Sequence, residues 1–189
     1  TRRSSDLARR MELIDVYDRN GNRTGKVVER GTSLLEGEYI LAVGMWIVDS
    51  QNRIFLTKRS SEKHFAPNKW ENPAGHVQAG ESCMDAVLRE VREETGLRIA
   101  PKQTTLLGAS RDAPYLGRDY GVRMNFDLNV IRLQPGETCD AKWVDFDGFK
   151  RMIEAGDLAP SVLGHMRSGY QENFLKFIGQ AADALPEKG

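Results

Sequence analysis

The stretch GHVQAGESCMDAVLREVREETGL, residues 75–97, decides how this chain folds. Ser82 has a side chain suited to capping the start of a helix. No glycine or proline interrupts residues 84–95, and Gly96 stands where helices often end in a left-handed residue. The stretch therefore predicts a loop, then a helix over 84–95, then a stop at Gly96.

The predicted helix carries two different faces. Four apolar residues recur at the spacing of a face that packs on a sheet: Met84, Val87, Leu88 and Val91. Three carboxylates share a second face: Glu90, Glu93 and Glu94. Like charges at this spacing repel by a few tenths of a kcal/mol per pair, and hard divalent cations that take carboxylate oxygens would cancel that repulsion. The second face is thus either a solvated acidic surface, with Arg89 and Arg92 as neighbours, or a cation site.

The same stretch resembles the Nudix box, G-x5-E-x7-R-E-U-x-E-E-x-G-U, in which U is a bulky aliphatic residue. Every specified position is matched: Gly75, Glu81, Arg89, Glu90, Val91, Glu93, Glu94, Gly96 and Leu97. The resemblance implies an α/β Nudix fold, an α/β/α sandwich with a mixed central sheet between the box helix and the C-terminal helices. It also implies hydrolysis, by water attack at phosphorus, of a diphosphate linkage in a nucleoside diphosphate joined to another group X.

The resemblance further implies roles for individual residues. The implied metal ligands are Glu90, Glu94, Glu93 and the carbonyl of Gly75, and the implied metal is Mg²⁺, with Mn²⁺ as an alternative. Catalytic roles fall on Glu90, Glu93, Arg89 and Glu81: Arg89 orients the glutamates and Glu81 supports the loop through a charge pair. Glu90 is the expected general base, with Glu137 and Asp140 as alternatives.

Residues before the box supply candidates for substrate binding. Lys58 and Arg59 end an alternating strand predicted over 53–59, where each either binds a substrate phosphate or is solvated. The segment P-x-x-W-x-x-P-x-G that follows looks like the approach to a Nudix box. We expect its Trp70 to pack against the box loop, with base stacking as the alternative.

Residues 11–30 predict a β-hairpin that turns at Asn20 and Gly21. This segment resembles the N-terminal hairpin of the Nudix subgroup related to isopentenyl-diphosphate isomerase. We expect an edge hairpin that completes the sheet rather than a substrate-contacting element.

The remaining elements follow from hydrophobic periodicity. We expect strands over 39–48, 98–99, 104–111 and 122–130, a glycine- and proline-bearing connection over 113–121, and helices over 145–155 and 161–178. Residues 1–10 are polar and expected to be flexible, which leaves a single domain over 11–189.

Composition limits the partners. The chain has 189 residues and a formal net charge of +0, so no global basic field points to nucleic acid. Two cysteines make no disulfide framework. The longest apolar run, residues 40–48, is too short to span a bilayer, and no signal peptide is evident. We expect a cytoplasmic protein that acts on a small-molecule diphosphate, without a membrane partner, and the family suggests a homodimer.

Two other functions compete with hydrolysis. An isopentenyl-diphosphate isomerase needs a catalytic cysteine just before its version of the box, and residues 70–74, WENPA, contain none. A non-catalytic Nudix-fold ligand sensor commonly lacks box glutamates, and none is missing here. The sequence leaves the identity of X open.

Overall fold

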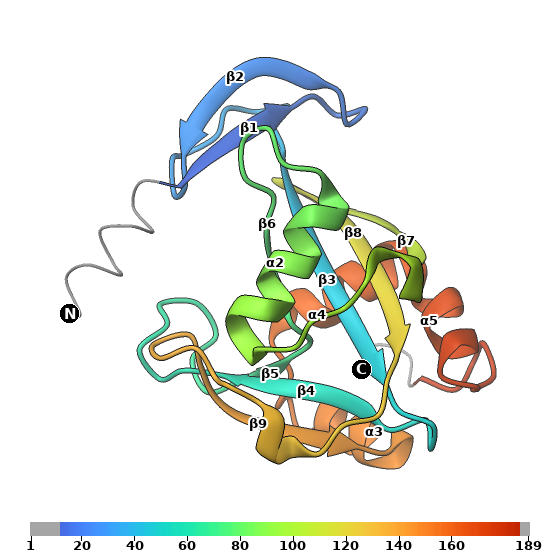
Figure 1. Cartoon of the computed structure of the whole chain (residues 1–189). Coiled ribbons are helices and arrows are strands. Elements are labelled where there is room, and N and C mark those ends of the chain that lie inside the picture. The colour runs from blue at the N-terminus through green and yellow to red at the C-terminus, as the bar shows by residue number, and fades with distance from the viewer. Residues whose placement is uncertain (1–11, 186–189) are drawn as a thin grey trace.

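The computed structural model describes residues 12–185, so the segment 1–10 expected to be flexible lies outside the described residues. A seven-stranded mixed sheet forms the centre, with helix α2 on one face and the C-terminal helices on the other (Figure 1). This architecture is the α/β/α sandwich predicted from the sequence. No helix within residues 12–185 has the length and apolarity needed to cross a membrane.

The strands of the central sheet lie in the order β5-β4-β3-β8-β7, with β6 paired to β3 and β9 paired to β4. Their bounds are β3 Ile40–Val48, β4 Ile54–Arg59, β5 Trp70–Glu71, β6 Ala74–His76, β7 Thr104–Asp112, β8 Tyr115–Arg123 and β9 Thr138–Val144. β3 and β8 are parallel, and the other pairs are antiparallel. β3 is therefore the central strand, as expected of a nearly continuous apolar run.

Strand β8 corrects two predictions. Residues 113–121 were expected to be a connection, but Tyr115–Arg123 pairs along the whole of β3, and the strand expected over 122–130 ends at Arg123. Residues Leu128–Val130 form a 3₁₀ helix instead. The glycines that suggested a loop are needed for close packing, because a Cβ on Gly121 would lie 2.8 Å from the ring of Phe177.

The prediction of a short strand over 98–99 is also wrong. Those residues are irregular and lead into a 3₁₀ helix over Pro101–Gln103. The strand expected over 104–111 is confirmed as β7.

Alternating side chains of β3 build two separate cores. Trp46 faces the C-terminal helices, where its ring centroid lies 4.4 Å from that of Phe174. Met45 and Ile47 face α2 and pack with Val87 and Val91. Burial of large side chains on both faces fixes the register of the sheet, because a slip of one residue would exchange the two cores.

The C-terminal helices lie at the predicted positions, but the second one is interrupted by a π-helical turn. α3 covers Phe146–Glu154, and the long helix expected over 161–178 consists of α4 Pro160–His165, a π-helical turn Met166–Tyr170 and α5 Gln171–Phe177. The π turn lies directly on β7, where a Cβ on Gly169 would be 1.9 Å from the carbonyl oxygen of Ala109. Glycine is therefore required at this contact between helix and sheet.

The N-terminal hairpin corrects a further prediction. β1 Leu13–Tyr17 and β2 Arg23–Glu29 form a two-stranded sheet of their own and do not extend the central sheet. The backbone pair Tyr17 and Tyr39 and the ion pair between Lys26 and Glu38 link the hairpin to the segment before β3. In Figure 1 the hairpin lies across one end of the molecule, above the loop between β6 and α2.

A buried polar group lies under the helical layer. Asp119 on β8 is 4% exposed, and the hydroxyl of Tyr170 bonds its carboxyl group and accepts a bond from Trp46 Nε1 at 3.1 Å. Burial raises the pKa of Asp119 from 3.8 to about 7, although the Tyr170 bond acts to lower it. A Cβ on the adjacent Gly44 would lie 2.5 Å from Asp119 Oδ1, so the glycine makes room for this carboxyl.

Two helical glycines provide a matched test of the π-turn contact. Gly169→Ala should lower the free energy of unfolding by about 1–3 kcal/mol, because the new methyl group meets backbone. Gly164→Ala meets only the end of the Asp112 side chain, at 3.3 Å, and should change stability by less than about 1 kcal/mol. Urea denaturation of both variants measures this difference, and equal effects would contradict the packing described.

Asp119 should make stability depend on pH. Between its unfolded pKa near 3.8 and its folded pKa near 7, the folded state binds more protons. The free energy of unfolding should therefore fall as pH rises through this window, by up to about 3 kcal/mol between pH 5 and 8. Asp119→Asn should flatten this dependence in urea titrations, whereas a variant of the exposed Asp157, Asp157→Asn, should retain it. A wild-type slope in Asp119→Asn would exclude Asp119 as the source.

Candidate active site

Helix α2 begins and ends as its sequence predicts. It spans Cys83–Thr95; the Ser82 side chain accepts a hydrogen bond from the Asp85 amide, and Gly96 has a φ of 77°. The apolar face packs on the sheet, which directs Glu90 and Glu94 toward the strands β5 and β6 that precede the helix. The helix thus presents its carboxylates to a fixed surface.

Arg89 lies at the centre of the box. Its five N–H groups make five hydrogen bonds: to both oxygens of Glu81 at 2.9 and 3.0 Å, to Glu90 at 2.7 Å, to Glu93 at 3.2 Å and to the carbonyl of His76 at 3.0 Å. Burial alone would lower the pKa of Arg89, but the bonds to Glu81 and the charge of Glu90 raise it. Arg89 therefore stays charged and links the loop, strand β6 and the helix.

Glu94 is the most enclosed of the three helix carboxylates. Glu94 is 7% exposed, and its Oε2 atom has no hydrogen-bond partner within residues 12–185. Burial raises its pKa well above 4.5, and the nearby charges of Glu71 and Glu90 add to this effect. Burial also raises the pKa of Glu90, partly offset by Arg89. Without a cation, the site thus disfavours the ionised carboxylates that its sequence brings together.

The arrangement fits a divalent cation. A Cβ on Gly75 would lie 2.1 Å from the Glu90 carboxyl carbon, so only glycine allows this carboxylate to reach the Gly75 backbone. Within residues 12–185 no three His, Cys, Asp or Glu side chains are placed to hold a metal ion by themselves. Mg²⁺ usually takes one or two carboxylates and keeps several waters, so two carboxylates and one backbone carbonyl are enough to hold such an ion. Glu93, 40% exposed and bound to Arg89, lies at the rim of the cluster.

Arg59 is held inside the protein structure. Its Nη1 atom donates to both oxygens of Glu71, at 2.7 and 3.0 Å, and its other nitrogens donate to the carbonyls of Phe65 and Ala66. Glu71 in turn neighbours Glu94. In this arrangement Arg59 stabilises the wall beside the carboxylates.

Lys58 and Trp70 lie opposite each other where β4 pairs with β5. The Lys58 ammonium is 5.7 Å from the centroid of the Trp70 ring, and that of Lys142 is 4.1 Å away. Trp70 packs against the core under the C-terminal helices, and its backbone bonds Asp157 and Ala159. The expectation that Trp70 packs against the box loop is therefore wrong.

The two alternative bases occupy different surroundings. Glu137 accepts a hydrogen bond from Lys63, whose charge also lowers the pKa of Glu94. Asp140 is exposed on β9, opposite Lys58, and its carboxylate accepts the Ala141 amide. Glu137 is thus linked to the carboxylate cluster through Lys63, whereas Asp140 lies on the exposed side of β9.

Two side chains of the site escaped the sequence analysis. Glu71 and Lys63 both act on Glu94, yet neither belongs to the box. In the sequence, a role for Glu71 is indicated only by its position between Trp70 and Pro73, in the segment that leads into the box. Lys63 lies in an irregular loop, where sequence spacing gives no indication of its neighbours.

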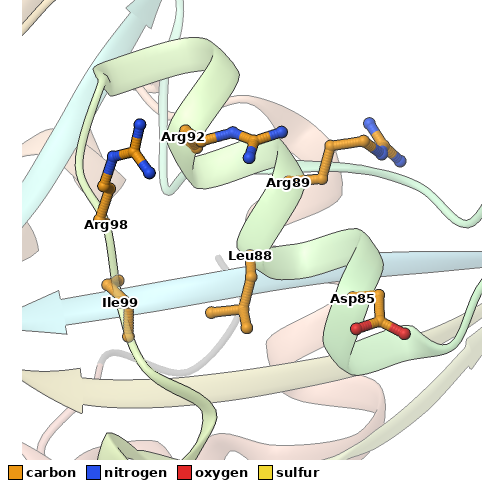
Figure 2. A pocket seen from close by; sticks show the side chains of 6 residues that line it. All are labelled: Asp85, Leu88, Arg89, Arg92, Arg98 and Ile99. Atoms are coloured by element: carbon orange, nitrogen blue, oxygen red, sulfur yellow. The ribbon is translucent and has the colours of Figure 1, made fainter.

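A shallow hollow of about 270 Å³ lies on the outer side of α2. Figure 2 shows Arg98, Arg92 and Arg89 along one edge, above Leu88 and Ile99. In the part of the chain that the structure describes, the side chains of Arg92 and Arg98 have no hydrogen bond or ion pair. The hollow shares Arg89 with the carboxylate cluster but contains none of its glutamates.

Comparison with known proteins agrees with this geometry. The model of the NUDIX domain matches residues 38–162. An uncharacterised Nudix hydrolase of Listeria monocytogenes is 28% identical over 151 residues, 79% of this chain and 89% of that protein. An isopentenyl-diphosphate Δ-isomerase of Shigella dysenteriae is 30% identical over 154 residues, 76% of this chain and 82% of the isomerase.

The fold is also shared with a solved structure. The crystal structure of DR0079 from Deinococcus radiodurans superposes with a TM-score of 0.69 at 20% identity and covers 83% of this chain and 99% of that one. The NUDIX model covers well over half of the chain and contains the whole carboxylate cluster with its arginine. The chain therefore belongs to the NUDIX domain family.

Proposed function

We propose that this Nudix hydrolase is a Mg²⁺-dependent pyrophosphohydrolase that cleaves the diphosphate linkage of a nucleoside diphosphate joined to another group. The observation that carries the proposal is the buried Glu94 oxygen beside Glu90, which has no hydrogen-bond partner among residues 12–185. A buried carboxylate without a hydrogen bond or a cation is costly. A divalent cation bound here offsets that cost and stabilises both glutamates as anions.

The proposed ligands are Glu90, Glu94 and the carbonyl of Gly75, with Glu93 at the rim. When bound, Mg²⁺, or Mn²⁺ in its place, neutralises the charge of the diphosphate that otherwise repels an attacking water. Arg89 holds Glu90 and Glu93 in place, and Glu81 holds Arg89. These two residues are proposed to orient the ligands and not to contact the substrate.

The proposed reaction is a displacement at phosphorus. Water forms the new oxygen–phosphorus bond, the anhydride bond breaks, and the released phosphate carries away the bond's electron pair. Glu90 is proposed to accept the proton of the water at its carboxylate. Glu137, which is paired with Lys63, and Asp140 are the alternative bases.

Substrate binding is proposed beside Lys58 and Trp70, where β4 pairs with β5. The Lys58 ammonium supplies a charge for a phosphate, and the indole supplies a flat face for a base. Arg59 is bound to Glu71, so its proposed contribution is to support this pair of strands. A cytoplasmic location and a homodimer stay predictions.

An isomerase is the second candidate, favoured by the 30% identity to the Shigella isopentenyl-diphosphate Δ-isomerase. Against it, Ala74 immediately precedes Gly75 of the box, and no cysteine lies in residues 70–74. The proton transfers of an isomerase would need other groups.

The test is a hydrolysis screen with and without Mg²⁺. The panel holds nucleotide sugars, dinucleotides, nucleoside triphosphates and isopentenyl diphosphate. Glu94→Gln keeps the shape of the side chain but loses its charge, and it should reduce turnover of any cleaved compound at least about 100-fold. Glu154→Gln, on the exposed side of α3, is the matched control and should act like the wild type.

The outcomes separate the candidates. Cleavage that needs Mg²⁺ and fails in Glu94→Gln supports the hydrolase and identifies X from the products. Rearrangement of isopentenyl diphosphate without cleavage of any compound supports the isomerase. Ligand binding without turnover would contradict both and favour a sensor.

A further inference from the structure

The N-terminal hairpin lies outside residues 38–162 that match the family, yet it binds the loop of the Nudix box. Three consecutive residues of that loop are bound in order. The Ala79 amide donates to the Leu13 carbonyl at 2.8 Å, the Gly80 amide donates to Asp15 Oδ2 at 2.9 Å, and Arg23 Nη2 donates to the Glu81 carbonyl at 3.2 Å. The hairpin therefore holds a complete turn of the box loop (Figure 1).

Asp15 is the side chain that organises this contact. Its carboxylate is 13% exposed, and the Oδ2 atom that accepts the Gly80 amide also accepts Arg23 Nε at 3.1 Å. Arg23 uses its Nη2 atom for the next residue of the loop, Glu81. One carboxylate thus fixes Gly80 directly and Glu81 through Arg23. Hydrogen bonds to a charged group are among the stronger ones in proteins.

The bound loop leads directly to the catalytic cluster. Hairpin contacts fix the backbone of Glu81, and the Glu81 side chain binds Arg89 through both oxygens. Arg89 then binds Glu90 and Glu93. Any movement of the turn at Gly80 shifts the anchor of Arg89, and so the glutamates that Arg89 holds.

We propose that Asp15 is a positioning residue of the active site and that the hairpin is part of the catalytic unit. This inference rests on the proposed metal-dependent function for its effect on turnover. Asp15 touches none of Glu90, Glu93 and Glu94; it acts through Arg23, Glu81 and Arg89. Substitution of a residue that orients metal ligands without contacting the metal commonly lowers metal affinity or activity by 10–100-fold.

The test compares Asp15→Ala with a control variant in the same hairpin. Asp15→Ala should weaken binding of Mn²⁺, measured alone by electron paramagnetic resonance, by about tenfold, and should lower kcat by about 10–100-fold with little change in KM. Lys26→Gln removes another hairpin ion pair, to Glu38 at 2.8 Å, which does not involve the box loop, and it should match the wild type. Asp15→Asn keeps an acceptor for the Gly80 amide and should recover most of the lost metal affinity.

Hydrogen exchange supplies a readout that needs neither metal nor substrate. In Asp15→Ala, the amides of residues 78–89 should exchange faster than in the wild type and in Lys26→Gln. If Asp15→Ala does not fold, Arg23→Gln replaces it, because half of the Arg23 side chain is exposed and its loss should perturb the loop in the same direction.

The outcomes distinguish this inference from the proposed function. Unchanged exchange in residues 78–89, or wild-type Mn²⁺ affinity in a folded Asp15→Ala, would overturn the role of the hairpin. If the wild-type protein binds Mn²⁺ but cleaves nothing, the proposed function fails while metal affinity and exchange still decide on Asp15. If it binds no Mn²⁺ either, exchange alone decides whether the hairpin holds the loop.

Discussion

The arrangement of the site depends on one fully bonded guanidinium group. All five N–H groups of Arg89 have acceptors, and these come from the loop, from strand β6 and from helix α2 itself. A lysine at this position would offer three donors from a flexible stem and could not bind both oxygens of Glu81 in a plane while reaching the other partners. Arg89 converts three separate chain segments into one rigid unit.

The bonds of Arg89 explain why burial affects Glu90 and Glu94 differently. Glu90 accepts a hydrogen bond from the charged Arg89. Among residues 12–185, by contrast, Glu94 Oε2 is buried without a hydrogen-bond partner. The arginine therefore stabilises the charge of the outer carboxylates, whereas burial raises the pKa values of Glu94 and Glu71 in the inner part of the cluster. Arg59 pairs with Glu71 and donates its Nε and Nη2 groups to backbone carbonyls of the loop. A small dication therefore has most effect beside Glu94, where burial disfavours the ionised carboxylate.

The sequence correctly predicts those elements that are specified by residues close to one another in the chain. The caps at Ser82 and Gly96, the apolar run of β3 and the spacing of α2 depend on neighbouring residues, and all are confirmed. β8 was missed because its glycines serve distant partners: Gly121 admits Phe177. Glu71 and Lys63 were missed for the same reason, since their significance comes from Glu94, which lies more than twenty residues away. Local patterns specify helices and caps, whereas contacts between distant segments decide which polar residues join the site.

The hairpin shows how such distant contacts extend the site beyond the family's shared domain. Its own pattern correctly predicts two strands and a turn, but the pattern holds no information about where the pair docks. Docking combines buried side chains of β1, Val16 and Tyr17, with polar contacts: a backbone carbonyl, one carboxylate and one guanidinium meet three successive groups of the box loop. A loop with a glycine at φ 80° has little preference of its own for a single shape. Because Glu81 must present both oxygens to Arg89 in one orientation, that loop needs an external support, and the hairpin is the element that supplies it.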